Sequence, residues 1–335
     1  MSVETGGLTA KLEETITAPA PDHGGMSTAL RRNLSSPWAS AFVILLTVLW
    51  TIPTLGLLIT SLRPAEEAAN SGWWTAFANP DFTLQNYSEV ISGGETIPGG
   101  IAPYFINSFV ISIPAAIIPL VLALMAAYAL AWVPFRWSNA VFLGIFALQV
   151  VPLQMALLPL LQLFNLGWFG LPSLKEMVQA MPILGDWLWP TGGTSFLPLW
   201  IAHTMFALPL AIFLLHNFIA QLPRDLFEAA RVDGASHFLI FRKLVLPLSV
   251  PAIASFAIFQ FLWVWNDLLV ALTFAGGTVE VAPITVYLSN IKGTYGAQLH
   301  LITAGAFIAI VVPLIVFFSL QRFFVRGLLA GSVKG

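Results

Sequence analysis

The sequence predicts an all-α membrane protein with six transmembrane helices, and two observations point to this class. Of the 335 residues, 58% are hydrophobic and only 9% are charged, whereas soluble domains carry about 25% charged residues. So few ionisable groups cannot cover the surface of a water-soluble protein of this length. In addition, six separate stretches reach the roughly 20 apolar residues that a helix needs to cross a bilayer. No long basic run is present, so we expect no nucleic-acid partner.

The six stretches follow a polar segment in chain order. Residues 1–36 contain no apolar run and are expected to form a flexible tail. The expected spans are 40–62, 105–131, 140–164, 196–219, 250–274 and 302–325. The stretch 165–195 is apolar enough for a re-entrant or interfacial helix, and this alternative to an external loop stays open. The expected organisation is a tail, a six-span domain over 37–326 and a second short tail over 327–335.

Positive charge indicates how the spans are oriented. An even number of spans places both termini on one side of the membrane. All but three of the 14 lysines and arginines fall in the tails or in the even-numbered loops, the exceptions being Arg63, Lys175 and Lys292. Because loops rich in these residues remain in the cytoplasm, both termini are expected to be cytoplasmic.

Residues that could carry chemistry are few. The sequence contains no cysteine, which excludes disulfides, thiolate metal sites and cysteine nucleophiles. His203 and His216 share one expected span but lie about 220° apart on the helical wheel, so we expect no metal site. A G-x-x-x-x-G-K-[ST] phosphate-binding loop is also missing, so the chain cannot supply nucleotide chemistry alone. No nucleophile with its base is visible, and we expect no enzyme.

One candidate for the lining of a translocation pathway is a polar and aromatic stripe in the fifth span. Asp267 is the only carboxylate inside an expected span, and Gln260 and Trp263 fall on the same helical face. Such side chains suit a sugar, and Gln154 of the third span joins them as a candidate, with Gln149 roughly opposite it. A structural role stays open for each, because polar side chains in spans also bind neighbouring helices.

The segment between the fourth and fifth spans breaks the apolar pattern. It concentrates charge at Arg224, Asp225, Glu228, Arg231, Asp233, Arg242 and Lys243. Gly234 can end a helix in the left-handed conformation, and Ser236 can cap a second helix. We therefore expect two short helices joined by a sharp bend within a loop over 222–247, with Pro247 beginning the next span. Their apolar side chains need a surface to pack against, either lipid headgroups or a soluble partner.

Several motifs resemble the MalG-type permeases of carbohydrate ABC importers. The EAA coupling motif of such permeases is matched by Glu228-Ala229-Ala230, Gly234, Leu244 and Leu246-Pro247. Further similar stretches are Asn107-Ser108, Ala126 to Ala131, Val151 to Gln154, Trp265 to Leu269 and the closing residues 325–335. The resemblance covers about 37–335, and residues 254–267 are most similar to alpha-glucoside permeases. The loop 276–300 resembles in position a loop that probes the sugar-binding protein.

The resemblance implies a permease subunit of an ATP-driven importer for a di- or oligosaccharide such as maltose, sucrose or trehalose. It implies a multi-pass protein of the bacterial inner membrane, in contact with lipid and working by alternating access. The implied partners are a MalF-like second permease in a heterodimer, two cytoplasmic ATPase subunits that bind ATP and magnesium, and an extracytoplasmic sugar-binding protein. The chain itself is expected to bind no cofactor.

The resemblance also assigns roles to residues. The implied contact with the ATPase is formed by Glu228, Ala229, Ala230, Asp233, Gly234, Leu244, Leu246 and Pro247. Most sugar contacts are implied to lie on the partner permease. A self-sufficient secondary sugar carrier is the alternative, although a carrier would usually show ionisable sites in several spans.

Overall fold

The structure is a computed structural model, and it describes the backbone of residues 37–94, 99–291 and 298–332, with side chains as far as Leu320. Helices dominate, and no β-strand occurs within these ranges, which confirms the predicted all-α class. A helix satisfies its backbone polar groups internally, as the bilayer interior requires. The predicted tail 1–36 lies outside the described residues. The chain divides into two compact units, one ending at Leu57 and one beginning at Leu58.

Most of α3 (Pro37–Ser61), 25 residues long, belongs to the first unit. In the described ranges, four helices are individually long and apolar enough to cross a membrane: α3, α6 (Ala102–Trp132), α11 (Leu197–Ile219) and the part of α18 from Leu299 to Leu320. Two bent helix pairs raise this number to as many as six. The expected six-span class therefore fits only if each bent pair counts as one span.

The expected third span, 140–164, is not one continuous helix. It consists of α7 (Ser138–Leu148) and α8 (Leu153–Asn165), whose axes differ by 97°. Pro152 lies directly before α8 and cannot donate a backbone hydrogen bond, and it also disfavours helical geometry at Val151. The third span is therefore interrupted, and residues 149–152 form a break within apolar sequence.

The expected fifth span, 250–274, begins as predicted but is not continuous to its end. α15 (Val250–Trp265) ends before Asp267, and α16 (Leu269–Phe274) begins a separate helix. The Asn266 side chain donates to the Leu262 carbonyl at 2.7 Å, and the Asp267 carboxylate accepts from the backbone N–H groups of Val270 and Ala271 at 3.3 and 3.0 Å. Short polar side chains that bond nearby backbone favour helix ends in this manner. Asp267 therefore does not continue the helical face of α15.

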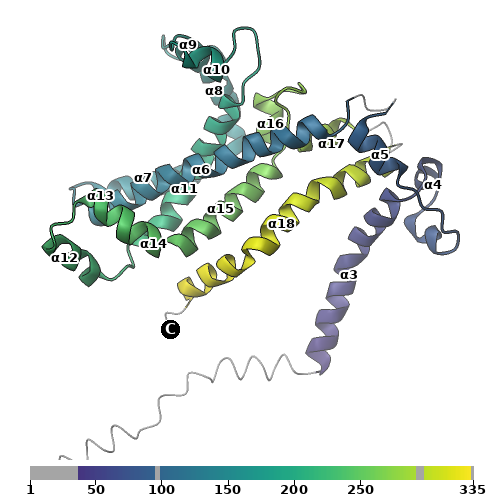
Figure 1. The fold of residues 1–335 in the computed structure, drawn as a ribbon, viewed down its shortest axis with the longest axis horizontal. Coiled ribbons are helices and arrows are strands. Elements are labelled where there is room, and N and C mark those ends of the chain that lie inside the picture. Colours follow the sequence, from purple (N-terminus) through teal and green to yellow (C-terminus); the bar gives the residue numbers. More distant parts are fainter. Residues whose placement is uncertain (1–36, 95–98, 292–297, 333–335) are drawn as a thin grey trace, which may run out of the picture. The chain divides into compact units, whose positions relative to one another are not determined.

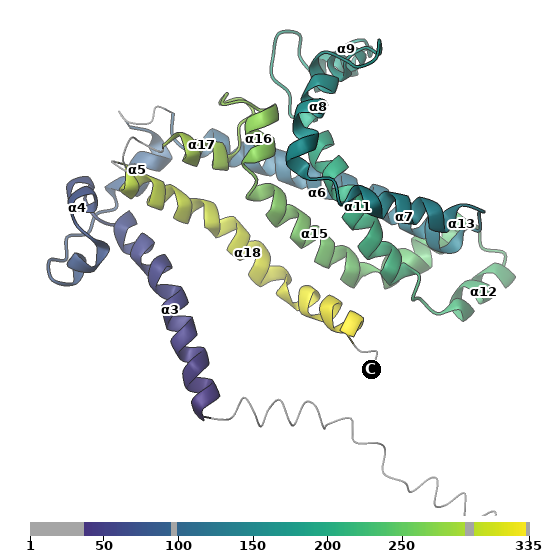
Figure 2. The same cartoon turned by 180° about the vertical axis from the view of Figure 1, so that it is seen from behind.

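Four long helices organise the second unit. α6 packs against α11 and α15, and α15 packs against α18, as both ribbon views show (Figures 1 and 2). Ala123 and Ala127 of α6 are fully buried in one apolar cluster with Ala207 and Ala211 of α11. Such small side chains let helix backbones approach closely, which is a common basis of helix association in membranes. α18 (Leu299–Ser332) extends through residues 327–332, part of the predicted C-terminal tail.

Buried polar side chains hold the segments that connect the spans. The Arg63 guanidinium donates to the carbonyls of Ser71 and Gly72 at 3.1 and 3.2 Å, between α4 (Ala65–Asn70) and η1 (Trp73–Phe77). Asn86 of α5 (Gln85–Ser92) donates to the carbonyls of Ser61 and Arg63 at 2.9 and 2.8 Å. This network fixes the segment that follows α3 to the end of that helix, within the second unit.

The stretch 165–195 contains two short helices, α9 (Leu174–Gln179) and α10 (Leu184–Leu188). Ser173 and Glu176 form a reciprocal capping box at the start of α9. Neither helix is long enough to cross a bilayer. Whether the stretch enters the membrane as a re-entrant segment stays a prediction.

The described part of the loop 276–300 is anchored to α6. The Asn107 side-chain amide donates to the carbonyls of Val279 and Ala282 at 2.8 and 3.0 Å. The Ser108 hydroxyl accepts from the Ile284 N–H at 2.8 Å, at the start of α17 (Ile284–Asn290). Burial raises the pKa of Tyr287 in α17 to about 12, and its hydroxyl donates to the Val90 carbonyl at 3.2 Å. The segment is therefore held to the ends of α6 and α5.

Replacing Asn107 by alanine should destabilise this anchor. The buried Ala282 carbonyl and the part-buried Val279 carbonyl would lose their donor, which costs about 1–3 kcal/mol in the free energy of unfolding. Thermal unfolding of the purified chain in detergent should show a lower Tm for Asn107→Ala than for Asn165→Ala. Asn165 is exposed and donates only to the Leu161 carbonyl of its own helix at 3.0 Å, so it is the matched control. Equal Tm values would contradict the anchoring role.

Candidate functional site

The first half of the predicted coupling loop is α12 (Arg224–Val232), which ends in a Schellman motif. Gly234 adopts φ = +77°, its N–H donates to the Arg231 carbonyl at 3.0 Å, and the Ala235 N–H donates to the Ala230 carbonyl at 2.9 Å. A left-handed residue without a Cβ is favoured at this position. The predicted helix end at Gly234 is therefore confirmed.

The second half of the coupling loop forms a longer helical run than the sequence predicts. The Ser236 hydroxyl accepts from the Leu239 N–H at 3.3 Å and caps α13 (His237–Ile240), as predicted. A single π-helical turn, η2 (Phe241–Val245), leads into α14 (Leu246–Leu248). In this wider turn the Leu246 N–H bonds the Phe241 carbonyl five residues back, just before Pro247, which has no N–H to offer.

The start of the next span is consequently displaced. Pro247 does not begin it, as the sequence predicts, but lies within the helical run His237–Leu248. The chain turns by 72° between Leu248 and Val250, at the buried residue Ser249. The coupling element, residues 222–248, therefore meets α15 at a sharp bend.

Aromatic contacts attach the coupling element to α6 and α11. Phe227 of α12 is buried and stacks on Trp132 at the end of α6, with ring centroids 3.6 Å apart and planes 9° from parallel. The Trp132 indole N–H donates to the Ile219 carbonyl of α11 at 3.1 Å. The Tyr128 hydroxyl lies 2.9 Å from His237 Nδ1. Part of the apolar surface of the two helices therefore packs within the chain itself.

The predicted contact residues lie mostly on the outer surface of the coupling element. Six of the eight are exposed, namely Glu228, Ala229, Asp233, Gly234, Leu246 and Pro247, whereas Ala230 and Leu244 are half-buried. Two large apolar side chains that the motif does not include are also exposed, Val232 at 87% and Phe238. Exposed apolar side chains among charged ones are a common feature of interaction surfaces.

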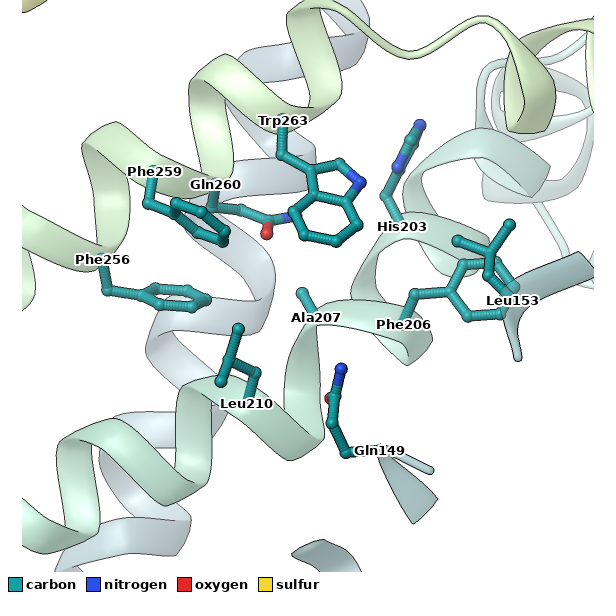
Figure 3. Close-up of a pocket in the computed structure, with 10 residues that line it drawn as sticks. All are labelled: Gln149, Leu153, His203, Phe206, Ala207, Leu210, Phe256, Phe259, Gln260 and Trp263. Carbon is teal, nitrogen blue, oxygen red and sulfur yellow. The ribbon is translucent and has the colours of Figure 1, made fainter. Parts of the chain in front are cut away.

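A second candidate site is a pocket between α11, α15 and the break in the third span. Figure 3 shows α15 on one side and α11 on the other, with Gln149 and Leu153 on a third. Its lining consists of Gln149, Leu153, His203, Phe206, Ala207, Leu210, Phe256, Phe259, Gln260 and Trp263. Two of these, Gln260 and Trp263, were predicted as pathway lining.

The other two predicted lining residues lie outside this pocket. Gln154 is exposed on α8. Asp267 caps α16, and its Oδ2 lies 3.8 Å from Nε2 of His203 on the neighbouring helix α11. Gln260 lines the pocket but donates its side-chain amide to the Ala115 carbonyl of α6 at 3.3 Å. Buried polar groups in the membrane interior need such partners.

The aromatic residues form the open part of the pocket. Trp263 and Phe259 are exposed, with ring centroids 5.5 Å apart in an edge-to-face arrangement, and Phe256 is buried beside them. Gln149, His203, Phe256 and Phe259 line the pocket but were not among the predicted lining residues. A signal existed for three of them, because 203, 206, 207 and 210, like 256, 259, 260 and 263, follow the i, i+3, i+4, i+7 spacing of one helical face. Gln149 lies in the break between α7 and α8, where a helical wheel cannot assign a residue to a face.

The described residues contain no group of three or more His, Asp or Glu side chains placed to hold a metal ion.

Known proteins similar to this chain were found by sequence. The family model described as "Binding-protein-dependent transport system inner membrane component" matches residues 119–329. The osmoprotective compounds uptake permease protein GgtD of Synechocystis sp. is 49% identical, over 87% of this chain and 90% of that protein. The alpha-glucoside transport system permease protein AglG of Rhizobium meliloti is 40% identical, over 88% of this chain and 96% of that protein.

A solved structure supports the fold. A bacterial ABC transporter involved in the import of the acidic polysaccharide alginate matches with a TM-score of 0.61, covering 92% of this chain and 100% of that one. At 16% identity, this likeness concerns the fold alone. The family match includes the coupling element and both helices that line the pocket. The chain therefore belongs to the binding-protein-dependent transport system inner membrane components, a family of multi-pass transport subunits and not of enzymes.

Proposed function

We propose that the chain is the permease subunit of an ATP-driven ABC importer for an alpha-glucoside, coupled to a separate ATPase through residues 222–247. The observation that carries this proposal is the coupling element, which is anchored to α6 and exposes six of the eight EAA-type contact residues. The alpha-glucoside substrate rests on similarity to the permease AglG. Maltose, sucrose and trehalose are the first sugars to test.

The coupling element is suited to transmit movement. Its first helix is joined to α6 by the stack of Phe227 on Trp132, and its second helix is joined to α6 by the contact of His237 with Tyr128. The bend at Ser249 leads directly into α15. A displacement of α12 by an ATPase would therefore move α6 and α15 together, and rigid-body movement of this kind is a common basis of alternating access.

The proposed assembly contains a MalF-like second permease, two ATPase subunits and an extracytoplasmic sugar-binding protein. ATP and magnesium would bind in the ATPase subunits. The excess of lysine and arginine in the tails and even-numbered loops supports cytoplasmic termini, so the coupling element would face the ATPase. Exposed Val232 and Phe238 would add apolar contact to the EAA residues.

We place the translocation pathway along the pocket between α11 and α15, with Gln260 and Trp263 as lining. Asp267 would instead join α16 to His203 of α11, the structural role that its hydrogen bonds support. Gln154 would face the pathway or the second permease from the exposed surface of α8.

Replacing Gly234 by valine should lower sugar-stimulated ATP hydrolysis roughly tenfold, equivalent to about 1.4 kcal/mol. A Cβ at Gly234 would meet no atom within 4 Å, so the effect arises from the left-handed backbone, which costs a residue with a side chain about 1–2 kcal/mol. Hydrolysis should be measured in the reconstituted importer with maltose, sucrose and trehalose, while membrane insertion stays intact.

The matched control for this variant is Gly192→Val. Gly192 also has a positive φ, +76°, and open space around its Cβ position, but it follows α10, outside the coupling element. The control should retain sugar-stimulated hydrolysis. Unchanged transport by Gly234→Val would refute the coupling assignment.

A thiol placed on the coupling element should crosslink to the ATPase. The chain has no cysteine, so Val232→Cys and Val150→Cys each give a single reactive site. The two valines are exposed to a similar extent, 87% and 81%, but Val150 lies in the break between α7 and α8. Photo-crosslinking in the assembled importer should join position 232, and not position 150, to an ATPase subunit.

Contact of position 232 with phospholipid alone throughout turnover would support an interfacial hairpin and contradict the coupling role. Sugar uptake by the purified chain without any ATPase would favour the secondary-carrier alternative.

A further inference from the structure

We infer that the pocket between α11 and α15 is a subsite for one uncharged glycosyl unit of the transported saccharide, with Trp263 and Phe259 as its stacking surface. This inference rests on the proposed function and adds a direct sugar contact to this subunit. The resemblance, in contrast, implies that most sugar contacts lie on the partner permease.

The break in the third span supports a substrate site at this pocket. Residues 149–152 are exposed and non-helical between two apolar helices. Irregular backbone at membrane depth is tolerated only where it is covered by protein or lines a cavity, and broken helices in transporters commonly lie at substrate sites. Gln149, at the start of this break, lines the pocket directly.

The aromatic side chains of the pocket suit the face of a sugar ring. Trp263 and Phe259 follow one another by one turn on α15 and are both exposed at the pocket. The face of a sugar ring carries C–H groups, which pack on an aromatic ring, while its rim carries hydroxyl groups that need polar partners. Gln149 and His203 supply polar groups around the aromatic surface (Figure 3). Trp263 and Phe259 are adjacent on one helical face and offer one stacking surface, which suits a single glycosyl unit.

The charge of the side chains that line the pocket indicates which class of saccharide fits it. No lysine, arginine, aspartate or glutamate is among the lining residues. A carboxylated or phosphorylated sugar would lose its hydration here without gaining a counter-charge, which is costly. His203 faces the Asp267 carboxylate, with Nε2 and Oδ2 3.8 Å apart, so an anionic group near it would also meet like charge. The pocket therefore suits a neutral saccharide.

The first test compares tryptophan variants in the complete importer reconstituted with its binding protein. Trp263→Ala should lower the rate of maltose, sucrose or trehalose uptake at saturating sugar by roughly five- to tenfold, the range expected for the loss of one aromatic stacking contact. Trp168→Ala is the matched control, because Trp168 is exposed to the same extent, 47% against 48%, but lies in the stretch 165–195 away from the pocket. The control should transport like wild type.

The second test measures occupancy of the pocket without relying on the transport rate. Single-cysteine variants Gln149→Cys and Asn165→Cys, both at exposed amide side chains, are labelled with a thiol reagent during turnover of the complete importer. Saturating maltose, sucrose or trehalose should slow labelling at position 149 by roughly fivefold, equivalent to about 80% occupancy, and leave position 165, which is not part of the pocket lining, unchanged. A uronic-acid disaccharide should slow neither.

The outcomes separate the two proposals. If a neutral disaccharide stimulates ATP hydrolysis by the wild-type importer but protects neither position, and Trp263→Ala transports normally, the subsite is overturned while the proposed function stands. If none of the three sugars stimulates hydrolysis, the alpha-glucoside assignment fails and the subsite fails with it. Equal protection by the uronic-acid disaccharide would overturn the neutral class.

Discussion

The requirement that every backbone N–H and carbonyl be satisfied inside hydrocarbon governs this structure. It explains the long helices α6, α11 and α18, whose backbone bonds are internal. It also makes the interruptions of the helices significant, because backbone groups at an interruption need other partners. The breaks at 149–152 and 266–268 and the bend at Ser249 lie in or beside the helices that form the pocket and the coupling element. The break at 149–152 ends at Pro152, and the bend at Ser249 lies between Pro247 and Pro251. At 266–268, the side chains of Asn266 and Asp267 bond nearby backbone groups.

The two candidate sites share their supporting helices. α6 carries Trp132 and Tyr128, which hold the coupling element, and also receives the amide of Gln260 from the pocket. α15 begins at the bend that ends the coupling element and carries Phe259 and Trp263. A movement that begins at α12 would therefore reach the pocket through two packed helices, with no flexible linker between them. This arrangement is consistent with mechanical coupling between ATP hydrolysis and access to a sugar.

The buried polar residues have two different roles: some hold neighbouring segments together, and others line the pocket. Asn107 and Asp267 bond backbone groups of nearby segments, and Arg63 bonds both backbone carbonyls and side-chain oxygens. Their cost of burial is offset because each satisfies donors or acceptors that would otherwise be orphaned. The pocket, in contrast, gains its character from aromatic rings and from Gln149 and His203. Polarity in a span is therefore a weaker guide to the lining than the spacing of aromatic residues along one face.

The sequence by itself determined the membrane class, the approximate positions of the spans, the helix end at Gly234 and the cap at Ser236, because composition, length and local backbone chemistry fix these features. It also contained the motifs by which the family is identified. The tertiary structure alone decided that two spans are interrupted and that the turn lies at Ser249 and not at Pro247. It also decided that Gln149 and His203 line one pocket with Trp263. These features depend on contacts between residues far apart in the chain, and a helical wheel drawn through a break assigns every later side chain to the wrong face.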